Sequence, residues 1–379
     1  MKVFEIISDT NIGGAGILLV TRLRHCDRSE FQTTVVLPRN SALKPRFDEI
    51  RIPVIEINGC ADRSFDISAV AEFCTLLRKY RPDLINCHGC LTARIAARLC
   101  CIPCIVYTRH CAYPPSHWQS SRIGKKIVGG IQHLLSDQII AVAQAAKKNL
   151  TDIGVSPNRI QVIVNGSDGL QKISREEQIN YMNALGFPQG SIVIGICARL
   201  EPCKGHMDLL RAAKLLLRTS RSYRFLIVGD GRFRRNLEEY CQSNGLLPYV
   251  RFVGFQKDVT PFVNLFYIQV NCSVGTETSS LALSEGMSIG IPSVVSNYGG
   301  NPHMVKNGVN GLIYPVRRYD CLAKRIQQIA ENPKLHERLS KGACQRFEKE
   351  FRATEMTRKT EQLYRSTFIR CSRRAGKAH

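Results

Sequence analysis

Short apolar runs alternate with longer amphipathic stretches along the whole chain. In the first half the apolar runs lie at residues 3–8, 33–38, 54–57, 83–89, 104–110 and 138–143. The alternation slackens at 160–178, where a strand-like run gives way to Gly, Asp and charged residues, and it restarts at 191–200. Strands that alternate with helices predict parallel sheets covered by helices on both faces. The pattern therefore indicates an α/β protein with two successive sheets.

The break near 160–178 predicts two doubly wound, Rossmann-like domains, at residues 1–168 and 169–350, facing a central cleft. A length of 379 residues agrees with about two domains. Residues 333–369 form a long helical stretch that we expect to break near Phe351. We expect residues 351–379 to form a C-terminal helix that returns to the N-terminal domain, followed by a basic tail.

The chain carries 53 Lys and Arg against 31 Asp and Glu, a net charge of +22. Such a field favours nucleic acid, anionic lipid headgroups or phosphorylated substrates as partners. No apolar run approaches the ~18 residues that span a bilayer, and MKVFEIISDT lacks the apolar stretch of a signal peptide. We therefore expect a cytoplasmic protein whose 16 cysteines are reduced.

A glycine-rich loop follows the first predicted strand, with Gly13, Gly14 and Gly16 in the sequence DTNIGGAGILL. Glycines let backbone N–H groups approach an anion, and a following helix adds a favourable dipole. The spacing is not G-x-G-x-x-G, and the loop has no Walker lysine. A plain tight turn explains such a loop about as well as a phosphate site.

A second loop, in GICARLEPCKGH, places Arg199 and Lys204 just after a predicted strand. A guanidinium forks onto phosphate oxygens and an ammonium adds a compact charge, so the pair suits a diphosphate. Ligands of open parallel sheets bind beyond the carboxyl ends of the strands, which is where this loop lies. On spacing alone, a solvated basic loop is an equally serious interpretation.

A third cluster surrounds Glu277 and Glu285 in GTETSSLALSEGMSIGIPSVVSNYGG. We expect a helix to begin near Ser279 or Ser280, and its free N–H groups suit a phosphate. Carboxylates accept hydrogen bonds from vicinal hydroxyls, so the two Glu residues could hold a sugar and a ribose. The alternative is a capped helix with a favourable early Glu.

Together these segments resemble the glycosyltransferases of family 4, which are retaining enzymes of the GT-B fold. Glu277 and Glu285, eight residues apart, match the family's E-x7-E segment, and ARLEPCKGH matches its Arg and Lys diphosphate site. The runs VIVNGSD, FLIVGDG, VRFVGF and GVNGLIYP occur in the order expected of the family, and the GGAG and YTRH segments also fit. The resemblance covers about residues 1–350.

The resemblance implies a role for each candidate residue. Arg199 and Lys204 stabilise the leaving nucleoside diphosphate, Glu277 contacts the donor sugar, and His110 lies at the reaction centre. With Arg199, Lys204 and Glu277, the donor site comprises Gly13, Gly14, Gly16, Thr278, Ser279, Ser280, Leu281 and Glu285. No metal ligand is implied, and the chain has no D-x-D metal motif. We therefore expect no cofactor and no metal requirement.

The sequence departs from the family pattern at three places. Thr278 stands where Gly often follows the first Glu, and Gly286 stands where Ala follows the second. Asn301 follows the paired glycines where a Glu is usual. These changes leave the Glu pair intact, but they leave the identity of the donor sugar open.

Two further patterns have a structural and a functional interpretation. Two CxxC pairs occur close together, formed by Cys87 with Cys90 and by Cys101 with Cys104. The helix expected between the pairs separates them by roughly 15 Å, so we favour buried reduced cysteines over a zinc site. His88 faces the carboxyl edge of its strand and fits either the acceptor side or a structural role.

An apolar stripe at helical spacing runs through residues 117–137. It consists of Ile123, Ile127, Ile131, Leu134 and Leu135, with Arg122, Lys125 and Lys126 beside it. Such a helix could lie at an anionic membrane surface. More often such a stripe packs onto its own domain, and this is the outcome we expect.

The leading hypothesis is a retaining glycosyltransferase that moves a sugar from a UDP-, GDP- or ADP-linked donor to an acceptor glycan or lipid-linked saccharide. An envelope or surface polysaccharide pathway, at the inner face of the membrane, is the expected setting. A nucleotide-sugar epimerase of the same fold is one alternative. A basic nucleic-acid-binding module is another, although aromatic residues are only 7% and no nucleic-acid motif is present.

Overall fold

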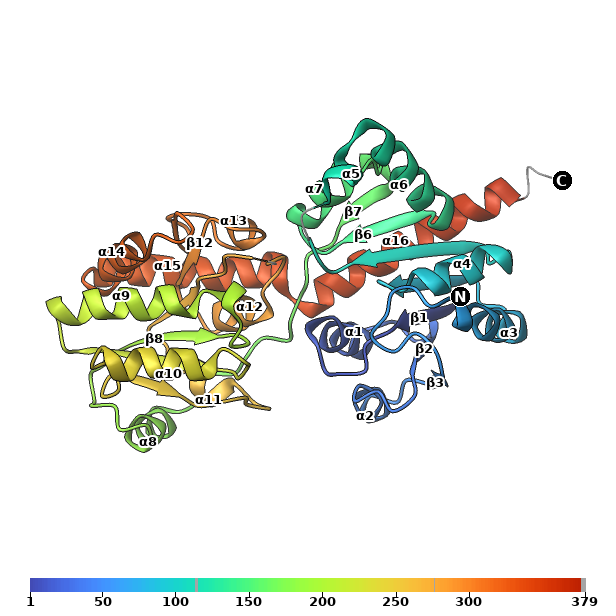
Figure 1. The fold of residues 1–379 in the computed structure, drawn as a ribbon. Helices are drawn as coiled ribbons and strands as arrows, with labels where there is room; N and C mark the ends of the chain where they lie inside the picture. The colour runs from blue at the N-terminus through green and yellow to red at the C-terminus, as the bar shows by residue number, and fades with distance from the viewer. Residues whose placement is uncertain (113–114, 276, 376–379) are drawn as a thin grey trace. The chain divides into compact units, whose positions relative to one another are not determined.

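The computed structural model describes residues 1–112, 115–275 and 277–375. It divides the chain into two compact units, each built around its own sheet (Figure 1). Unit 1 comprises Met1–Gly166 and the segment that begins at Ala353, and unit 2 comprises Ser167–Arg352. Thr276, which precedes Glu277, and the last four residues of the predicted basic tail lie outside the described residues.

Unit 1 contains a seven-stranded sheet in the order β3-β2-β1-β4-β5-β6-β7, and every pairing is parallel. Its strands are β1 (Lys2–Ile7), β2 (Gln32–Pro38), β3 (Val54–Ile57), β4 (Leu84–His88), β5 (Cys104–Arg109), β6 (Gln138–Ala141) and β7 (Ile160–Val162). Its helices are α1 (Gly14–Arg24), α2 (Lys44–Glu49), η1 (Ile67–Ala69), α3 (Val70–Tyr80), α4 (Leu91–Leu99), α5 (His117–Ser120), α6 (Arg122–Leu135), α7 (Gln144–Asp152), η2 (Pro157–Arg159) and α16 (Ala353–Ala375).

The two faces of this sheet bury different helices, because successive side chains of a strand point to opposite faces. Phe4 and Ile6 of β1 belong to the core beneath α3 and α4. Ile7 belongs to the core beneath α1 and α2. Glu5 shares the face of Ile7, and α16 joins α1 there, where the Thr357 hydroxyl donates to the Arg22 carbonyl.

Unit 2 contains a six-stranded parallel sheet in the order β10-β9-β8-β11-β12-β13. Its strands are β8 (Ile192–Cys197), β9 (Tyr223–Val228), β10 (Val250–Phe252), β11 (Ile268–Asn271), β12 (Ser293–Ser296) and β13 (Gly311–Tyr314). Its helices are α8 (Arg175–Ala184), η3 (Pro202–Lys204), α9 (His206–Thr219), α10 (Arg234–Ser243), α11 (Thr260–Val263), α12 (Leu281–Ser288), α13 (Asn301–Met304), α14 (Tyr319–Ala330), α15 (Pro333–Arg346) and η4 (Phe347–Phe351). Helices cover both faces, so the predicted doubly wound architecture is confirmed.

The predicted break in the C-terminal helical stretch is also present. α15 ends at Arg346, a π-helical turn occupies Phe347–Phe351, and α16 begins at Ala353. Phe351 is fully buried, so packing of its ring holds this turn in place. Within the described residues, no helix combines the length and the apolar character needed to cross a bilayer.

Candidate active site

The strand order of unit 2 reverses direction between β8 and β11. β9 and β10 follow on one side of β8, whereas β12 and β13 follow on the other side of β11. Ligands of open parallel sheets bind at such a switch point, beyond the carboxyl ends of the two strands. Arg199 and Lys204 follow β8, and Glu277 follows β11. The fold therefore brings these three predicted site residues to one crevice.

Lys204 and Glu277 form a partly buried ion pair at this switch point. The Lys204 ammonium donates to Glu277 Oε2 at 2.9 Å, and the same oxygen accepts from Ser273 Oγ at 2.8 Å and Asn271 Nδ2 at 3.2 Å. Burial acts to raise the pKa of Glu277, but Lys204 and the two hydrogen bonds outweigh it and hold that pKa below its ordinary value. Glu277 is therefore an ionised acceptor held in a fixed direction.

Arg199 lies in an exposed part of the loop that follows β8. Its guanidinium makes no hydrogen bond or ion pair with any residue that the structure describes. The loop itself is fixed, because the Leu200 N–H donates to the Asp230 carbonyl at 2.9 Å and Gly205 closes it with a φ of +71°. A Cβ on Gly205 would lie 2.0 Å from the Cys272 carbonyl oxygen, so only glycine fits. A fixed loop thus presents a cation that pairs with none of the residues in the described part of the chain.

The backbone before α12 is held by the paired glycines that follow β12. The Gly300 N–H donates to the Glu277 carbonyl at 3.1 Å, and a Cβ on Gly300 would lie 1.5 Å from the Thr278 carbonyl oxygen. Ser279 is buried, and Ser280 caps α12 by accepting from the Leu283 N–H at 3.3 Å. The first N–H groups of α12, beginning at Leu281, have no acceptor within the helix and carry its positive dipole end.

Glu285 lies in the second turn of α12, near the end of β8. Burial raises the pKa of its carboxyl group, and its charge helps to raise the pKa of the neighbouring Cys197 thiol. Among the described residues its carboxylate has no hydrogen-bond partner. A partly buried carboxylate without a partner suits a ligand that brings its own hydroxyl donors.

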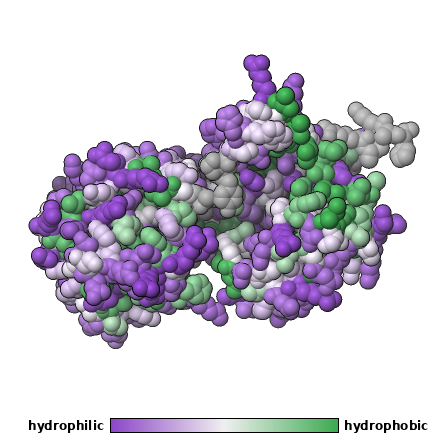
Figure 2. All heavy atoms as spheres, in the orientation of Figure 1, coloured by the Kyte–Doolittle hydropathy of each residue, from purple (hydrophilic) through white to green (hydrophobic). Residues whose placement is uncertain are grey.

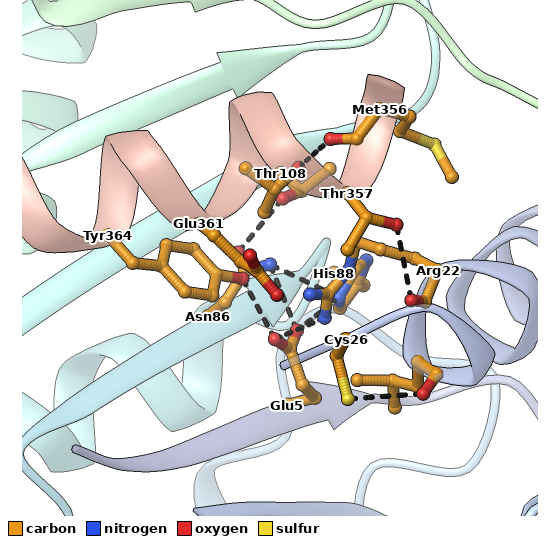
Figure 3. A network of polar contacts seen from close by, with 12 residues as sticks. Glu5, Arg22, Cys26, Asn86, His88, Thr108, Met356, Thr357, Glu361 and Tyr364 are labelled. Carbon is orange, nitrogen blue, oxygen red and sulfur yellow. Dashed lines mark hydrogen bonds and ion pairs between the residues drawn. The ribbon is translucent and has the colours of Figure 1, made fainter. Parts of the chain in front are cut away.

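Unit 1 carries a buried polar network at its own switch point, between β1 and β4 (Figure 3). Glu5 of β1 is fully buried and ion-paired with Arg22 of α1. Its carboxylate also accepts from Tyr364 at 2.8 Å, His88 at 2.9 Å and Asn86 at 3.0 Å. Sequence reasoning missed Glu5, although a carboxylate inside an apolar parallel strand is a signal in itself.

His110 follows β5, and its Nε2 lies 2.8 Å from His88 Nδ1. Burial, assisted by the charge of His88, lowers the pKa of His110 to about 3, so its imidazole is neutral at physiological pH. His88 Nε2 lies 2.9 Å from Glu5 Oε2, so the carboxylate and the two imidazole rings form one continuous chain of hydrogen bonds. His88 is thus tied to Glu5 and His110, which favours the structural interpretation of this residue.

The glycine-rich loop follows β1 at the same edge of unit 1. Gly13 caps α1, and Gly14 begins it in open space, where a Cβ would meet nothing within 4 Å. Gly16 is buried in the first turn, and a Cβ there would lie 2.4 Å from the Leu43 side chain. Gly16 therefore has a packing role, whereas Gly13 and Gly14 leave backbone accessible.

The two CxxC pairs do not converge. Cys90 lies against Cys60, Cys104 lies against Cys371, and Cys101 is exposed. No group of three or more His, Cys, Asp or Glu side chains with a metal-binding arrangement occurs in the described part of the chain. Three of the four thiols in the two CxxC pairs are buried, which agrees with the expected packing role.

Comparisons with known proteins assign both parts of the chain to known families of enzymes. Residues 12–168 match the family model described as Glycosyltransferase Family 4, and residues 177–346 match Glycosyl transferases group 1. The Escherichia coli UDP-Gal:alpha-D-GlcNAc-diphosphoundecaprenol alpha-1,3-galactosyltransferase is 26% identical over 313 residues, which is 79% of each chain.

Solved structures show the same fold. Anabaena HepE in complex with UDP has a TM-score of 0.84 at 22% identity, covering 97% of this chain and 100% of its own. A glycosyltransferase from Rickettsia africae has a TM-score of 0.82 at 18% identity, covering 97% and 98%. The predicted GT-B fold is confirmed, and the two family models lie on either side of the break between the two sheets. The chain belongs to the family 4 glycosyltransferases and is a sugar-transferring enzyme.

Proposed function

We propose that this enzyme transfers a sugar from a UDP-sugar to a lipid-linked saccharide with retention of anomeric configuration. The observation that carries the proposal is the convergence of Arg199, Lys204, Glu277 and the N-terminus of α12 at one switch point. Two cations and a helix N-terminus suit a diphosphate, and an adjacent fixed carboxylate suits sugar hydroxyls.

The donor residues divide into those that neutralise charge and those that orient the sugar nucleotide. Arg199 and Lys204, with the N–H groups of Leu281 and Ala282 at the N-terminus of α12, stabilise the negative charge that develops on the departing UDP. Glu277, fixed by Lys204, accepts from donor sugar hydroxyls. Glu285, which has no partner among the described residues, accepts from the ribose hydroxyls.

In this proposal the positive charge comes from the protein and not from a divalent ion. Preorganised cations and N–H groups stabilise developing charge without reorganisation during the reaction. Turnover is therefore expected to continue in excess EDTA. Loss of activity in EDTA that Mg²⁺ or Mn²⁺ restores would refute metal independence while leaving the diphosphate site in place.

On the side of unit 1 we propose that His110 lies beside the reacting sugar and that the Gly13–Gly14 backbone meets phosphate or acceptor. The proposed donor and acceptor are based on the ligands for which similar proteins are named. The Escherichia coli relative is named for a UDP-galactose donor and a diphosphoundecaprenol-linked acceptor, and Anabaena HepE binds UDP and UDP-glucose. A lipid-linked acceptor would place the enzyme at the inner face of the membrane.

Donor binding is tested by titration calorimetry of the full chain with UDP, GDP and ADP and their glucose conjugates. Selective micromolar binding of the uridine ligands is expected. Arg199→Ala should weaken UDP binding by about 10- to 100-fold, because each charge-assisted hydrogen bond is worth about 1.5–3 kcal/mol. Arg199 pairs with no described residue, so the variant should fold normally.

The matched control is Arg218→Ala, which removes an exposed guanidinium from the last turn of α9 and should leave affinity unchanged. Equal loss in both variants would mean that the effect is net charge and not the site. Release of UDP that requires a lipid-linked acceptor would separate the transferase from an epimerase, which converts its donor alone.

A further inference from the structure

Helix α6 packs onto unit 1 through glycine. A Cβ on Gly129 would lie 2.3 Å from the Gly154 carbonyl oxygen, and one on Gly124 would lie 2.0 Å from the Trp118 carbonyl oxygen. Glycine inside a helix lowers its stability by about 1 kcal/mol relative to Ala. Here Gly129 permits a close approach to the Gly154 backbone, so the side of α6 that carries Gly129 points inward.

The apolar stripe of α6 faces outward instead. Ile123 and Leu134 are 69% and 68% exposed, and Ile127 and Ile131 are 46% and 43% exposed. Only Leu135 of the five predicted residues is buried. The expectation that this stripe packs onto its own domain was therefore wrong, because helical spacing defines a stripe but not the side that meets the sheet.

The exposed stripe continues onto neighbouring elements. The Arg98 side chain donates to the Leu134 carbonyl at 2.6 Å, which joins the end of α4 to the end of α6. Leu99 at the end of α4 and Trp118 of α5 are also more than half exposed. Figure 2 shows hydrophobic residues gathered in a band over α6 and α4. The α6 face is defined here as Leu99, Trp118, Ile123, Ile127, Ile131 and Leu134. A contiguous apolar patch of this kind marks an interaction site.

The charge around the α6 face is of one sign. The sequence from 84 to 136 contains no Asp or Glu, and Arg122, Lys125 and Lys126 of α6 are exposed. Asp137, the first carboxylate after this stretch, is ion-paired with Arg98 at 2.8 Å. Basic side chains beside an apolar helix face complement anionic lipid headgroups. A second copy of the chain would instead bring two basic clusters together.

The position of α6 in the fold places the α6 face near the carboxyl edge of the unit 1 sheet. α6 connects β5 to β6, so its N-terminus lies toward the carboxyl edge of the unit 1 sheet, where β5 leads into His110. A bilayer against α6 would therefore lie beside the edge that carries the candidate reaction centre. This step rests on the proposed function, which supplies the lipid-linked acceptor.

We propose that the α6 face docks this enzyme onto an anionic bilayer. α6 lies along the headgroup region with its isoleucines in the acyl boundary, and Arg122, Lys125 and Lys126 contact anionic headgroups. The chain thereby reaches its acceptor in the plane of the membrane without a spanning helix among its described residues.

The chain's single tryptophan reports on this docking, because Trp118 belongs to the α6 face. The full chain is mixed with vesicles of phosphatidylcholine alone or with 30% phosphatidylglycerol, and flotation and Trp emission are measured. Binding with a blue shift is expected on the anionic vesicles, decreasing with added salt. No flotation and no blue shift on anionic vesicles, or equal binding to neutral vesicles, would overturn the proposal.

Matched variants distinguish binding through the α6 face from nonspecific hydrophobic binding and from the effect of net charge. The variant Ile127→Ser with Ile131→Ser should bind anionic vesicles at least tenfold more weakly. The control variant Ile67→Ser with Leu247→Ser changes side chains that are more exposed but lie elsewhere, and it should bind normally. Lys125→Gln with Lys126→Gln should weaken binding roughly 30-fold at low salt. Lys214→Gln with Arg218→Gln makes the same charge change on α9 and should have little effect.

Two further outcomes are decisive. If the test and control variants weaken binding equally, the α6 face is not the docking surface. If the chain forms dimers that the Ile127→Ser and Ile131→Ser changes abolish, the face is a protein interface and the proposal fails. UDP affinity is measured on the same variants and should not change, so failure of docking is distinguishable from failure of the proposed function.

Discussion

The buried pair of Glu5 and Arg22 makes unit 1 sensitive to acid in a way that can be calculated. The Glu5 carboxylate accepts from four side chains, and although burial acts to raise its pKa, Arg22 and the hydrogen bonds lower that pKa from 4.5 to about 2. A shift of this size corresponds to about 3 kcal/mol of stability. Because the folded pKa is depressed, this stability is present above pH 4.5 and is lost as the pH falls toward 2.

Replacing Arg22 with Met keeps most of the side-chain volume but leaves a buried carboxylate without its cation. Removing one partner of a buried pair destabilises by about 3–5 kcal/mol. For unit 1, which contains fewer than 200 residues, this corresponds to a Tm lower by roughly 6–20 °C. The pH dependence should also reverse, because Glu5 without Arg22 has a raised pKa and its protonation then favours the folded state.

Urea unfolding between pH 3 and pH 8, followed by Trp118 fluorescence, measures these changes in unit 1. The double variant Glu5→Gln with Arg22→Met should recover part of the lost stability at pH 7, because no unpaired charge remains. In the Glu5→Gln variant alone, the free energy of unfolding should change less with pH below pH 4.5 than it does in the wild type. The reasoning is refuted if Arg22→Met costs less than about 1 kcal/mol, or if the double variant is no more stable than Arg22→Met.

Three more predictions concern individual positions. Gly300→Ala should destabilise unit 2 by about 3 kcal/mol or more and weaken UDP binding, because the Thr278 carbonyl occupies the space of the new Cβ. Gly130→Ala, whose new Cβ would meet nothing within 4 Å, should instead stabilise helix α6 of unit 1 by about 0.5–1 kcal/mol in the same urea assay. UDP affinity should fall with decreasing pH as Glu285, whose pKa is raised, becomes protonated, and calorimetry of Glu285→Gln should show weaker binding without that pH dependence. The His110 ring should give the NMR shifts of a neutral imidazole down to about pH 4, and a midpoint near 6.5 would contradict the burial argument.

The grouping of Arg199, Lys204 and Glu277 followed from the sequence, because it depends on local sequence patterns. Apolar parallel strands are readable as runs, and the loops after them lie at the carboxyl edge of a sheet. Arg199, Lys204 and Glu277 could therefore be assigned to one edge before their contacts were known. The contact between Lys204 and Glu277, and the clamp of Gly300 on Thr278, needed the strand order, which places β8 beside β11.

The network around Glu5 depended on the tertiary structure. Its members are far apart in the chain, with Glu5 and Tyr364 separated by 359 positions, and local periodicity carries no information at that separation. The sequence marks Glu5 only as a polar residue within an apolar strand. What pairs with it depends on which helices cover that face of the sheet.

Helix α6 shows most clearly the difference between what local spacing determines and what tertiary packing determines. Spacing of Ile123, Ile127 and Ile131 determined that a helix forms there with one apolar side. Whether that side is buried depends on which side of the helix approaches the rest of the unit more closely. Gly129 allows the backbone at Gly154 to approach on the opposite side, so tertiary packing turned the isoleucines to the surface.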